Sequence, residues 1–258
     1  MSLVRAKKQL GQHFLTDKNI AEKIVNSLQL SESVHHVLEV GPGMGILSDF
    51  LFQQKAFETY LIDIDTESIA FLHKKYPEVG SRIISGDFLA YDFSTITEGQ
   101  LGIIGNFPYN ISSQILFKVL DNRQHVQQVV GMFQKEVGER LAAGHGSKVY
   151  GITSVLTQAY YDAAYLFTVS EGSFNPPPKV KSGVIRLVRR ADPPAVPYGQ
   201  LAAVVKTAFN QRRKTLRNAL KSLPLYSEDA LAPWADRRAE QLSVAEFVEL
   251  TERLYRGS

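Results

Sequence analysis

Short apolar segments alternate with amphipathic segments along most of the chain, and this rhythm limits the possible folds more than any other feature. Such alternation predicts a mainly parallel sheet with helices on both of its faces. The expected strands are His36–Val40, Thr59–Asp63, Arg82–Ser85, Leu101–Gly105 and Val126–Phe133. The expected helices are Asp17–Leu28, Ile46–Gln54, Thr66–Tyr76, Ser112–Leu120, Lys135–Leu141 and Val149–Gln158. An α/β fold is therefore expected.

The rhythm changes after the last of these helices. Two β-rich runs, Ala164–Val169 and Ser182–Val188, flank the turn segment Glu171–Lys181, a pattern typical of an antiparallel pair at the edge of a sheet. Beyond them, Ala191–Pro197 holds three prolines in seven residues, enough to interrupt any regular element. The remainder is helical by pattern, at Leu201–Asn210, Lys214–Leu220, Glu228–Leu231 and Val244–Tyr255.

These changes of pattern predict the domain organisation. We expect a catalytic domain over residues 1–190, a Pro-rich linker over residues 191–198, and a small all-α domain over residues 199–258.

The positive charge of the chain is concentrated near its end. Residues 1–198 hold 19 Lys and Arg against 19 Asp and Glu, whereas residues 199–258 hold 10 against 7. Five of these ten cations cluster at Arg212, Arg213, Lys214, Arg217 and Lys221. A basic cluster beside a neutral body favours docking on a polyanion such as RNA, with a solvated helix face as the alternative.

Several function classes are excluded or disfavoured by what the sequence lacks. There is no cysteine, so neither a disulfide framework nor a thiolate metal site can form. Six histidines are scattered without metal-ligand spacing, and no metal is expected. The chain shows no leader-like apolar region, and no run approaches the ~18 apolar residues of a membrane helix. We therefore expect a cytoplasmic protein.

The segment Val37–Gly45 reads as a buried strand that enters a glycine-rich turn. Glycine permits positive φ and a close approach of ligand to backbone. A dinucleotide fingerprint requires G-x-G-x-x-G, but position 46 is Ile, so the spacing does not fit a pyrophosphate loop. Glu-x-Gly-x-Gly-x-Gly instead resembles the first motif of class I S-adenosylmethionine methyltransferases. A tight strand–helix connection is the structural alternative.

Acidic residues follow the next two expected strands. Asp63 ends the second strand, 22 residues after Gly41, where its carboxylate can accept both hydroxyls of a ribose. Asp65 reads as a helix cap. Asp87, after the third strand, can accept from an adenine amine while Phe88 packs on the ring. Since open α/β sheets bind ligands at the carboxyl ends of their strands, these residues predict a nucleoside cofactor, S-adenosylmethionine rather than NAD.

The fourth strand leads into Gly105–Asn110, which reads Gly-Asn-Phe-Pro-Tyr-Asn. This loop suits methyl transfer to the N6 amine of adenine. That amine is a poor nucleophile because its lone pair is delocalised into the ring. Two acceptors for its N–H bonds, the Asn106 side-chain oxygen and the Pro108 carbonyl, would favour a pyramidal nitrogen. Tyr109 offers a stacking face for the base, worth ~1–3 kcal/mol. Positioning and electrostatics then supply most of the catalysis.

Together these motifs resemble the KsgA/RsmA family of 16S ribosomal RNA adenine N6,N6-dimethyltransferases, over nearly the whole chain. Lys8–Leu15 resembles the family's N-terminal cofactor motif, with His13 where Asn is most common. Asn106–Tyr109 resembles the Asn-Leu-Pro-Tyr signature, with Phe at the second place. Phe174–Val180 is similar to a late Pro-rich motif, and Asn210–Asn218 to the basic helix that meets ribosomal RNA.

The resemblance implies which residues bind and react. It implies a cofactor site that contains His13, Leu15, Gly41, Asp63, Asp87 and Asn106. The glycine turn and the loop after the third strand add Gly43 and Phe88. The family commonly has Glu at the ribose position, where this chain has the shorter Asp63. Phe174 would line the target pocket, and Phe174 and Tyr109 would hold the extruded base between them.

The substrate implied by the resemblance is a pair of adjacent adenines in the 3′-terminal hairpin loop of 16S rRNA, on an immature small ribosomal subunit. Each adenine would receive two methyl groups, as a step of ribosome biogenesis, from a protein expected to be a monomer.

Three other functions are alternatives to this one. The nearest is a 23S rRNA adenine dimethyltransferase of the Erm type, which the motifs Phe174–Val180 and Asn210–Asn218 argue against. A DNA adenine methyltransferase more often carries Asp or Asn followed by Pro-Pro-Tyr. A non-catalytic ribosome-assembly factor predicts a damaged cofactor site, yet the glycines and acidic residues are all present.

Overall fold

The computed structural model of the protein describes residues 4–256. Contacts divide these residues into two compact units. The first, called the sheet unit, comprises the described residues up to Gly138 together with Ala164–Arg189. The second, called the helical unit, comprises Glu139–Ala163 and the described residues from Arg190 onward.

The helical unit resumes at Arg190, beside the linker predicted over residues 191–198, and it also contains Glu139–Ala163. This segment was expected in the first domain and groups with the helical unit. The reason is that α6 (Ile152–Tyr160) packs against α7 (Tyr198–Asn210) and α10 (Val244–Arg256). Hydrophobic periodicity predicts that a helix is amphipathic, but it does not say which partner covers the apolar face.

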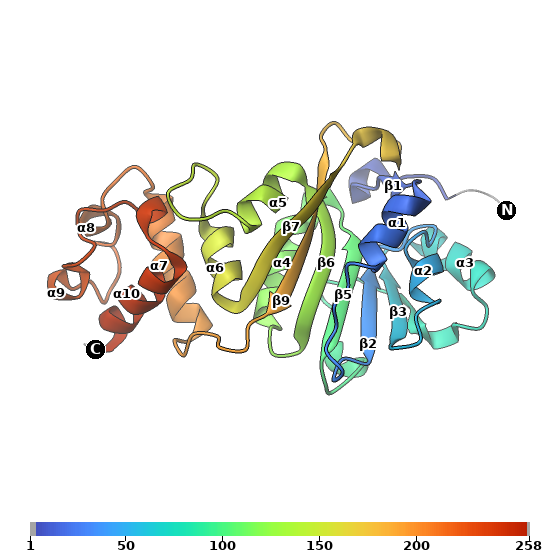
Figure 1. The fold of residues 1–258 in the computed structure, drawn as a ribbon, viewed down its shortest axis with the longest axis horizontal. Helices are drawn as coiled ribbons and strands as arrows, with labels where there is room; N and C mark the ends of the chain where they lie inside the picture. Colours follow the sequence, from blue (N-terminus) through green and yellow to red (C-terminus); the bar gives the residue numbers. More distant parts are fainter. Residues whose placement is uncertain (1–3, 257–258) are drawn as a thin grey trace. The chain divides into compact units, whose positions relative to one another are not determined.

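A seven-stranded sheet has the order β4-β3-β2-β5-β6-β9-β7 (Figure 1). Strands β4, β3, β2, β5 and β6 pair parallel with one another, and β9 pairs antiparallel with β6. The strands are β2 (His36–Val40), β3 (Glu58–Asp63), β4 (Ile83–Ser85), β5 (Leu101–Asn106), β6 (Val126–Gln134), β7 (Tyr161–Val169) and β9 (Ser182–Arg189). The expected α/β sheet with an antiparallel strand toward one edge is confirmed.

Helices cover the sheet, with α1 in front of it and α4 behind it in Figure 1. The helices are α1 (Lys18–Val25), α2 (Ser48–Leu51), α3 (Thr66–Lys75), α4 (Ser112–Asp121) and α5 (Lys135–Leu141). Short 3-10 turns complete the connections at Gly80–Arg82, Phe93–Thr95 and Tyr109–Ile111. Helix α2 is shorter than expected because residues 44–47 form turns before it begins.

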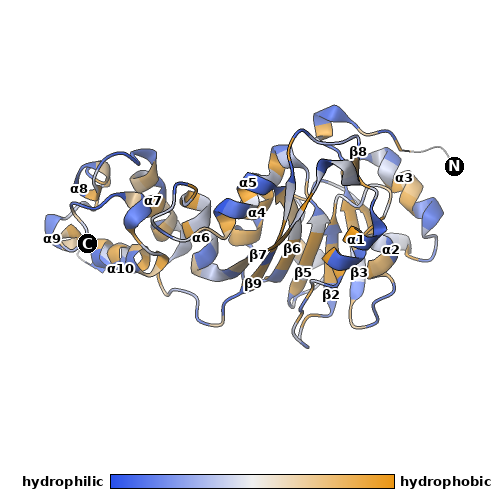
Figure 2. Cartoon of the chain, turned by 45° about the horizontal axis from the view of Figure 1, so that its top comes forward, coloured by the Kyte–Doolittle hydropathy of each residue, from blue (hydrophilic) through white to orange (hydrophobic). Residues whose placement is uncertain are grey.

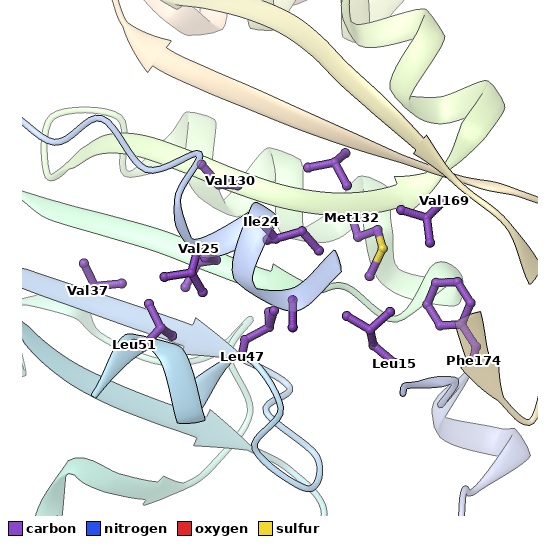
Figure 3. Close-up of a cluster of buried hydrophobic side chains, with 13 residues drawn as sticks. Leu15, Ile24, Val25, Val37, Leu47, Leu51, Val130, Met132, Val169 and Phe174 are labelled. Atoms are coloured by element: carbon purple, nitrogen blue, oxygen red, sulfur yellow. The ribbon is translucent and has the colours of Figure 1, made fainter. Parts of the chain in front are cut away.

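The core of the sheet unit is apolar, as the orange strands of Figure 2 show. One cluster joins α1, α2 and the central strands, with Ile24, Leu47, Leu51 and Val130 at 0–1% exposure (Figure 3). Burial of this kind stabilises the fold by ~25 cal/mol per Å² of apolar surface. The core thus holds rigid the strands whose carboxyl ends carry the polar residues.

The N-terminal arm, residues 4–15, reaches the sheet unit through a small second sheet. Lys8–Leu10 forms a 3-10 turn, and β1 (Phe14–Leu15) then pairs antiparallel with β8 (Phe174–Asn175). The register places Leu15 opposite Phe174. A further 3-10 turn, Glu171–Ser173, precedes β8.

The helical unit adds α8 (Leu216–Ala219) and α9 (Glu228–Leu231) to α6, α7 and α10. A 3-10 turn at Ala239–Gln241 precedes α10. The predicted helix Lys214–Leu220 is only partly formed, because residues 211–214 are turns. Within residues 4–256, no helix combines the length and apolar character needed to span a membrane.

Candidate functional site

A pocket of about 1000 Å³, counting space open to solvent, lies at the carboxyl ends of the parallel strands. Residues from the N-terminal arm form part of its wall, at Leu10–Phe14. It gathers most of the residues that the sequence singled out, namely His13, Gly41, Gly43, Asp63, Asp87, Phe88, Asn106, Pro108 and Tyr109. Among the residues predicted to bind the cofactor or the target base, Leu15 and Phe174 are the exceptions.

The glycine turn after β2 fits its predicted role. Gly41 and Gly43 have φ of 66° and 55°, which L side chains rarely adopt. A Cβ on Gly41 would meet nothing closer than 4.0 Å, so a side chain there would occupy space of the pocket itself. A Cβ on Gly43 would lie 2.7 Å from the Phe14 ring. The turn therefore leaves room for a ligand on one side and packs under the arm on the other.

Two residues that the sequence analysis missed brace this turn from behind. Tyr76 donates to the Gly45 carbonyl at 2.9 Å, and Lys75 donates to the Met44 carbonyl at 3.1 Å. Both also contact the Asp49 carboxylate. Nothing in the local sequence signals this role, since the partners lie about 30 positions apart along the chain.

Asp63 ends β3 at 7% exposure, with its carboxylate inside the pocket wall. Its oxygens accept from the amides of Asp65, at 2.8 Å, and Gly43, at 3.3 Å. Burial raises the pKa of Asp63 above its usual value. An ionised carboxylate has about four lone-pair sites, so these bonds leave acceptor capacity for a ligand hydroxyl. Asp65 caps α3 as expected, accepting from the Glu67 amide at 3.1 Å.

The loop after β4 supplies an apolar wall and an exposed carboxylate. Phe88 is 5% exposed and packs on Phe93, with ring centroids 5.5 Å apart. Asp87 accepts from the Leu89 amide at 2.9 Å. Ile64, missed by the sequence analysis, also lines the pocket although its side chain is 56% exposed. Its side chain offers surface to an apolar part of a ligand.

The Asn106 side chain has a defined orientation. Its amide nitrogen donates to the His13 carbonyl at 2.7 Å. A carbonyl can only accept, so the nitrogen must face His13 and Oδ1 must face the other way. Asn106 lines the pocket, so Oδ1 is a candidate acceptor within it. The His13 ring nitrogen Nδ1 lies 2.8 Å from the Pro176 carbonyl.

The Pro108 carbonyl differs from the prediction. It already accepts from the Ile111 amide at 3.2 Å and from the Ser112 hydroxyl at 3.1 Å. Both lone pairs are thus engaged within the turn that begins α4. Its neighbour Phe107 lines the pocket, and its ring is buried against Phe133 with centroids 5.1 Å apart.

The Tyr109 ring lines the pocket beside His13, with ring centroids 5.6 Å apart. Its hydroxyl lies 2.5 Å from the Ser182 hydroxyl on β9, and burial raises its pKa above the usual value. A neutral, hydrogen-bonded phenol keeps the ring in one position. The loop and the antiparallel strand therefore act together in orienting this side chain.

Leu15 and Phe174 do not line the pocket, contrary to expectation. Both are 4% exposed and pack in the apolar core beside Val169 and Met132 (Figure 3). The β1–β8 register pairs these two residues, and alternation along a strand then directs neighbouring Phe14 to the other side. The expected pairing of Tyr109 with Phe174 around a base is therefore absent from this structure.

The five predicted RNA-binding residues lie in the helical unit, in the turn after α7 and around α8. Arg212 is half-buried, donates to the Ser147 carbonyl at 3.2 Å and lies 3.8 Å from Glu240. Arg217 pairs with Asp236 at 3.5 Å. Arg213, Lys214 and Lys221 are exposed. Within residues 4–256, these three make no ion pair.

The pocket fits a ligand that is partly apolar and carries hydroxyls and amines. It presents glycine backbone, a buried carboxylate at Asp63, the apolar surfaces of Phe88 and Ile64, and the amide of Asn106. Residues 4–256 contain no group of three or more side chains that could hold a metal ion. A nucleoside matches this combination.

Solved structures share the fold. A dimethyladenosine transferase from Plasmodium falciparum superposes with a TM-score of 0.81 at 25% identity, covering 92% of this chain and 96% of that one. The 23S rRNA methyltransferase ErmE gives 0.73 at 23% identity, covering 94% and 99%. The fold and the strand-end pocket define a class I S-adenosylmethionine methyltransferase.

Sequence relatives define the family. Residues 3–255 match the ribosomal RNA adenine dimethylase family. A protein of Cytophaga hutchinsonii named ribosomal RNA small subunit methyltransferase A is 55% identical over 98% of this chain and 99% of its own length. A protein of the same name from Flavobacterium johnsoniae is 52% identical over 98% and 97%. The chain belongs to the ribosomal RNA adenine dimethylase family, a family of enzymes that use S-adenosylmethionine.

Proposed function

We propose that this protein dimethylates the N6 amines of two adjacent adenines in the 3′-terminal hairpin loop of 16S rRNA. It would act as a monomer on the immature small subunit in the cytoplasm. The observation that carries the proposal is the convergence of Asp63, Asp87 and Asn106 on one pocket at the carboxyl ends of three parallel strands. The small subunit is favoured because relatives about half identical to this chain are named small-subunit methyltransferases.

S-adenosylmethionine, when bound, supplies an electrophilic methyl group on a sulfonium centre. We assign Asp63 to the ribose hydroxyls, Asp87 to the adenine amine and Phe88 to the adenine ring. Gly41 and Gly43 leave room for the ligand beside their backbone. His13 acts through its backbone carbonyl, which fixes the Asn106 amide.

The target adenine is held by the loop after β5. Asn106 Oδ1 accepts from the N6 amine, which localises the nitrogen lone pair and aims it at the donor. Because the Pro108 carbonyl is engaged, we assign the second acceptor role to the carbonyl of Phe107, a residue that also lines the pocket. Tyr109 offers its ring for stacking. The proton is lost from the amine after it becomes positively charged, so no strong base is needed.

The helical unit contributes RNA affinity. Arg213, Lys214 and Lys221 are exposed cations that can neutralise phosphates, whereas Arg212 and Arg217 also have partners within the protein. The assignment of residues 199–258 as the rRNA-binding domain rests on these side chains.

The first test measures transfer of labelled methyl groups to four substrates: undermethylated small subunits, large subunits, naked ribosomal RNA and DNA. Paired N6,N6-dimethyladenosines near the small-subunit 3′ end, mapped by mass spectrometry, are expected. Label in the large subunit would instead support the Erm-type function. Binding to small subunits with no transfer to any substrate would support a non-catalytic assembly factor.

Replacement of Asn106 tests the mechanism. Asn106→Ala removes the acceptor for the N6 amine and the bond to the His13 carbonyl. Turnover should fall by at least ~10²-fold, the scale for removal of one preorganised polar group at a reacting centre. Binding of S-adenosylmethionine should weaken but persist, as measured by calorimetry. Asn19→Ala, an exposed asparagine of α1, is the control. Full turnover of Asn106→Ala would contradict the mechanism.

A further inference from the structure

The N-terminal arm forms one wall of the pocket but has little structure of its own. Leu10–Phe14 line the pocket. The arm contains one 3-10 turn and a strand of two residues, Phe14–Leu15. Isolated elements this short are marginal in water, so contacts with the rest of the sheet unit must hold the arm in place.

One end of the arm is tied to β5 and β8. The Asn106 amide donates to the His13 carbonyl at 2.7 Å, and β1 pairs with β8. These contacts belong to the site already described. Between the two ends, the Asn110 side chain donates to the Gln9 carbonyl at 3.5 Å, which is long for a hydrogen bond.

The other end is tied to Asp65, at the start of α3. Lys7 Nζ lies 2.5 Å from Asp65 Oδ1, and Gln12 Nε2 donates to Asp65 Oδ2 at 3.1 Å. Gln12 Oε1 in turn accepts from the Lys7 amide at 2.8 Å, which closes a ring of contacts. Lys7 Nζ also lies 3.1 Å from Glu67 Oε1.

Burial of Asp65 increases the energetic importance of its contact with Lys7. The Asp65 side chain is 0% exposed, whereas that of Lys7 is 29% exposed. Burial disfavours the charged form of Asp65, but the bonds from Lys7 and Gln12 outweigh it and lower its pKa. A buried carboxylate that loses its cation is left poorly compensated, which costs more than loss of a surface ion pair. The arm supplies that cation.

Asp65 is also connected to the pocket. Its backbone amide donates to Asp63 Oδ1 at 2.8 Å, and Asp63 lines the pocket. The short segment 63–65 therefore both anchors the arm, through Asp65, and positions the Asp63 carboxylate. Lys7 itself is not among the residues that line the pocket.

We propose that Lys7, Gln12 and Asp65 form a latch that holds the N-terminal arm closed over the cofactor pocket and thereby sets cofactor affinity. Lys7 and Asp65 are positioning residues, because they act through the arm and touch no reacting atom. The proposal rests on the assignment of this pocket to S-adenosylmethionine. The latch governs how long the cofactor and its demethylated product stay bound, and it leaves the transfer step unchanged.

The test compares Lys7→Met with Arg5→Met, which removes one positive charge from an exposed residue of the same arm outside the cofactor motif. Binding of S-adenosylmethionine and S-adenosylhomocysteine is measured by calorimetry, and product release by stopped flow. If a variant keeps the arm closed in only about a tenth of its molecules, the apparent Kd for the cofactor rises about tenfold. Lys7→Met should show this rise and a KM for S-adenosylmethionine raised to match, with kcat at saturating cofactor within about twofold of wild type. Lys7→Arg should restore affinity.

Hydrogen exchange provides a second readout. Amides of residues 8–15 should lose protection in Lys7→Met, while those of α3 keep it. Equal affinities for Lys7→Met and Arg5→Met would overturn the latch, as would a fall in kcat with KM unchanged. Failure of the wild-type protein to bind S-adenosylmethionine would instead refute the proposed function.

Discussion

At the residue scale, Glu39 is a carboxyl group that does not line the pocket but affects the stability of the sheet unit. It is 1% exposed in the middle of β2, and Ser48 donates to its Oε2 at 2.5 Å. Burial raises its pKa from 4.5 to about 8. The folded state therefore binds a proton that the unfolded state releases between these values, so stability falls as pH rises through this window.

Glu39→Gln should remove this dependence. From about pH 6 to about pH 8 the wild-type free energy of unfolding should decrease by roughly 2 kcal/mol through this group, since one pKa unit corresponds to ~1.36 kcal/mol. The free energy of unfolding of the variant should decrease less over this range, because the uncharged amide oxygen can still accept from Ser48. Denaturant unfolding at both pH values measures the difference. Glu22→Gln, an exposed residue of α1, is the control. Parallel pH profiles for wild type and Glu39→Gln would contradict the prediction.

At the element scale, the packing of β5 against β6 explains why the loop signature Asn106–Tyr109 has Phe at its second position. Gly105 and Gly131 pair across these strands, and Phe107 covers both. A Cβ on Gly131 would lie 2.1 Å from the Phe107 ring. The larger side chain fits because neither strand carries one of its own at that point.

Gly131→Ala should therefore displace Phe107 and, with it, neighbouring Asn106. Overpacking of this kind costs ~1–3 kcal/mol of stability, and methyl transfer should fall because the acceptor moves. The double variant Gly131→Ala with Phe107→Leu has room for both side chains and should recover most of the stability and most of the activity. Unfolding and turnover are measured on the wild type and on both variants. A double variant no better than the single one would show that packing against Phe107 is not the cause.

At the scale of the whole molecule, the exposed cations of the helical unit determine how binding depends on salt. Replacing Arg213 and Lys214 with Gln should reduce the slope of log affinity against log salt, measured on small-subunit RNA. The reduction should be about one for each phosphate that is no longer neutralised. Arg212→Gln should chiefly lower stability, because its partners are Ser147 and Glu240. The exposed pair Lys55 and Lys74 of the sheet unit is the charge-matched control. Equal slopes for both double variants would mean that the basic cluster is only a solvated surface.

Local patterns determined the sheet and much of the site. Asp63, Asp87 and Asn106 each end or follow a strand that periodicity identifies, and parallel strands bring their carboxyl ends to one edge. The glycine turn is likewise local, since its positive φ values are set by residue type. Sequence order alone therefore predicted that these residues meet.

Only the tertiary structure decided which partner each remaining side chain takes. Leu15 and Phe174 lie in the core because the β1–β8 register directs them there. The latch between Lys7 and Asp65 joins residues 58 positions apart, and Glu139–Ala163 groups with the helical unit through contacts with the distant α7 and α10. Periodicity and motifs report which face of an element is apolar and which residues are polar. The choice among compatible partners depends on packing geometry, which no single segment contains.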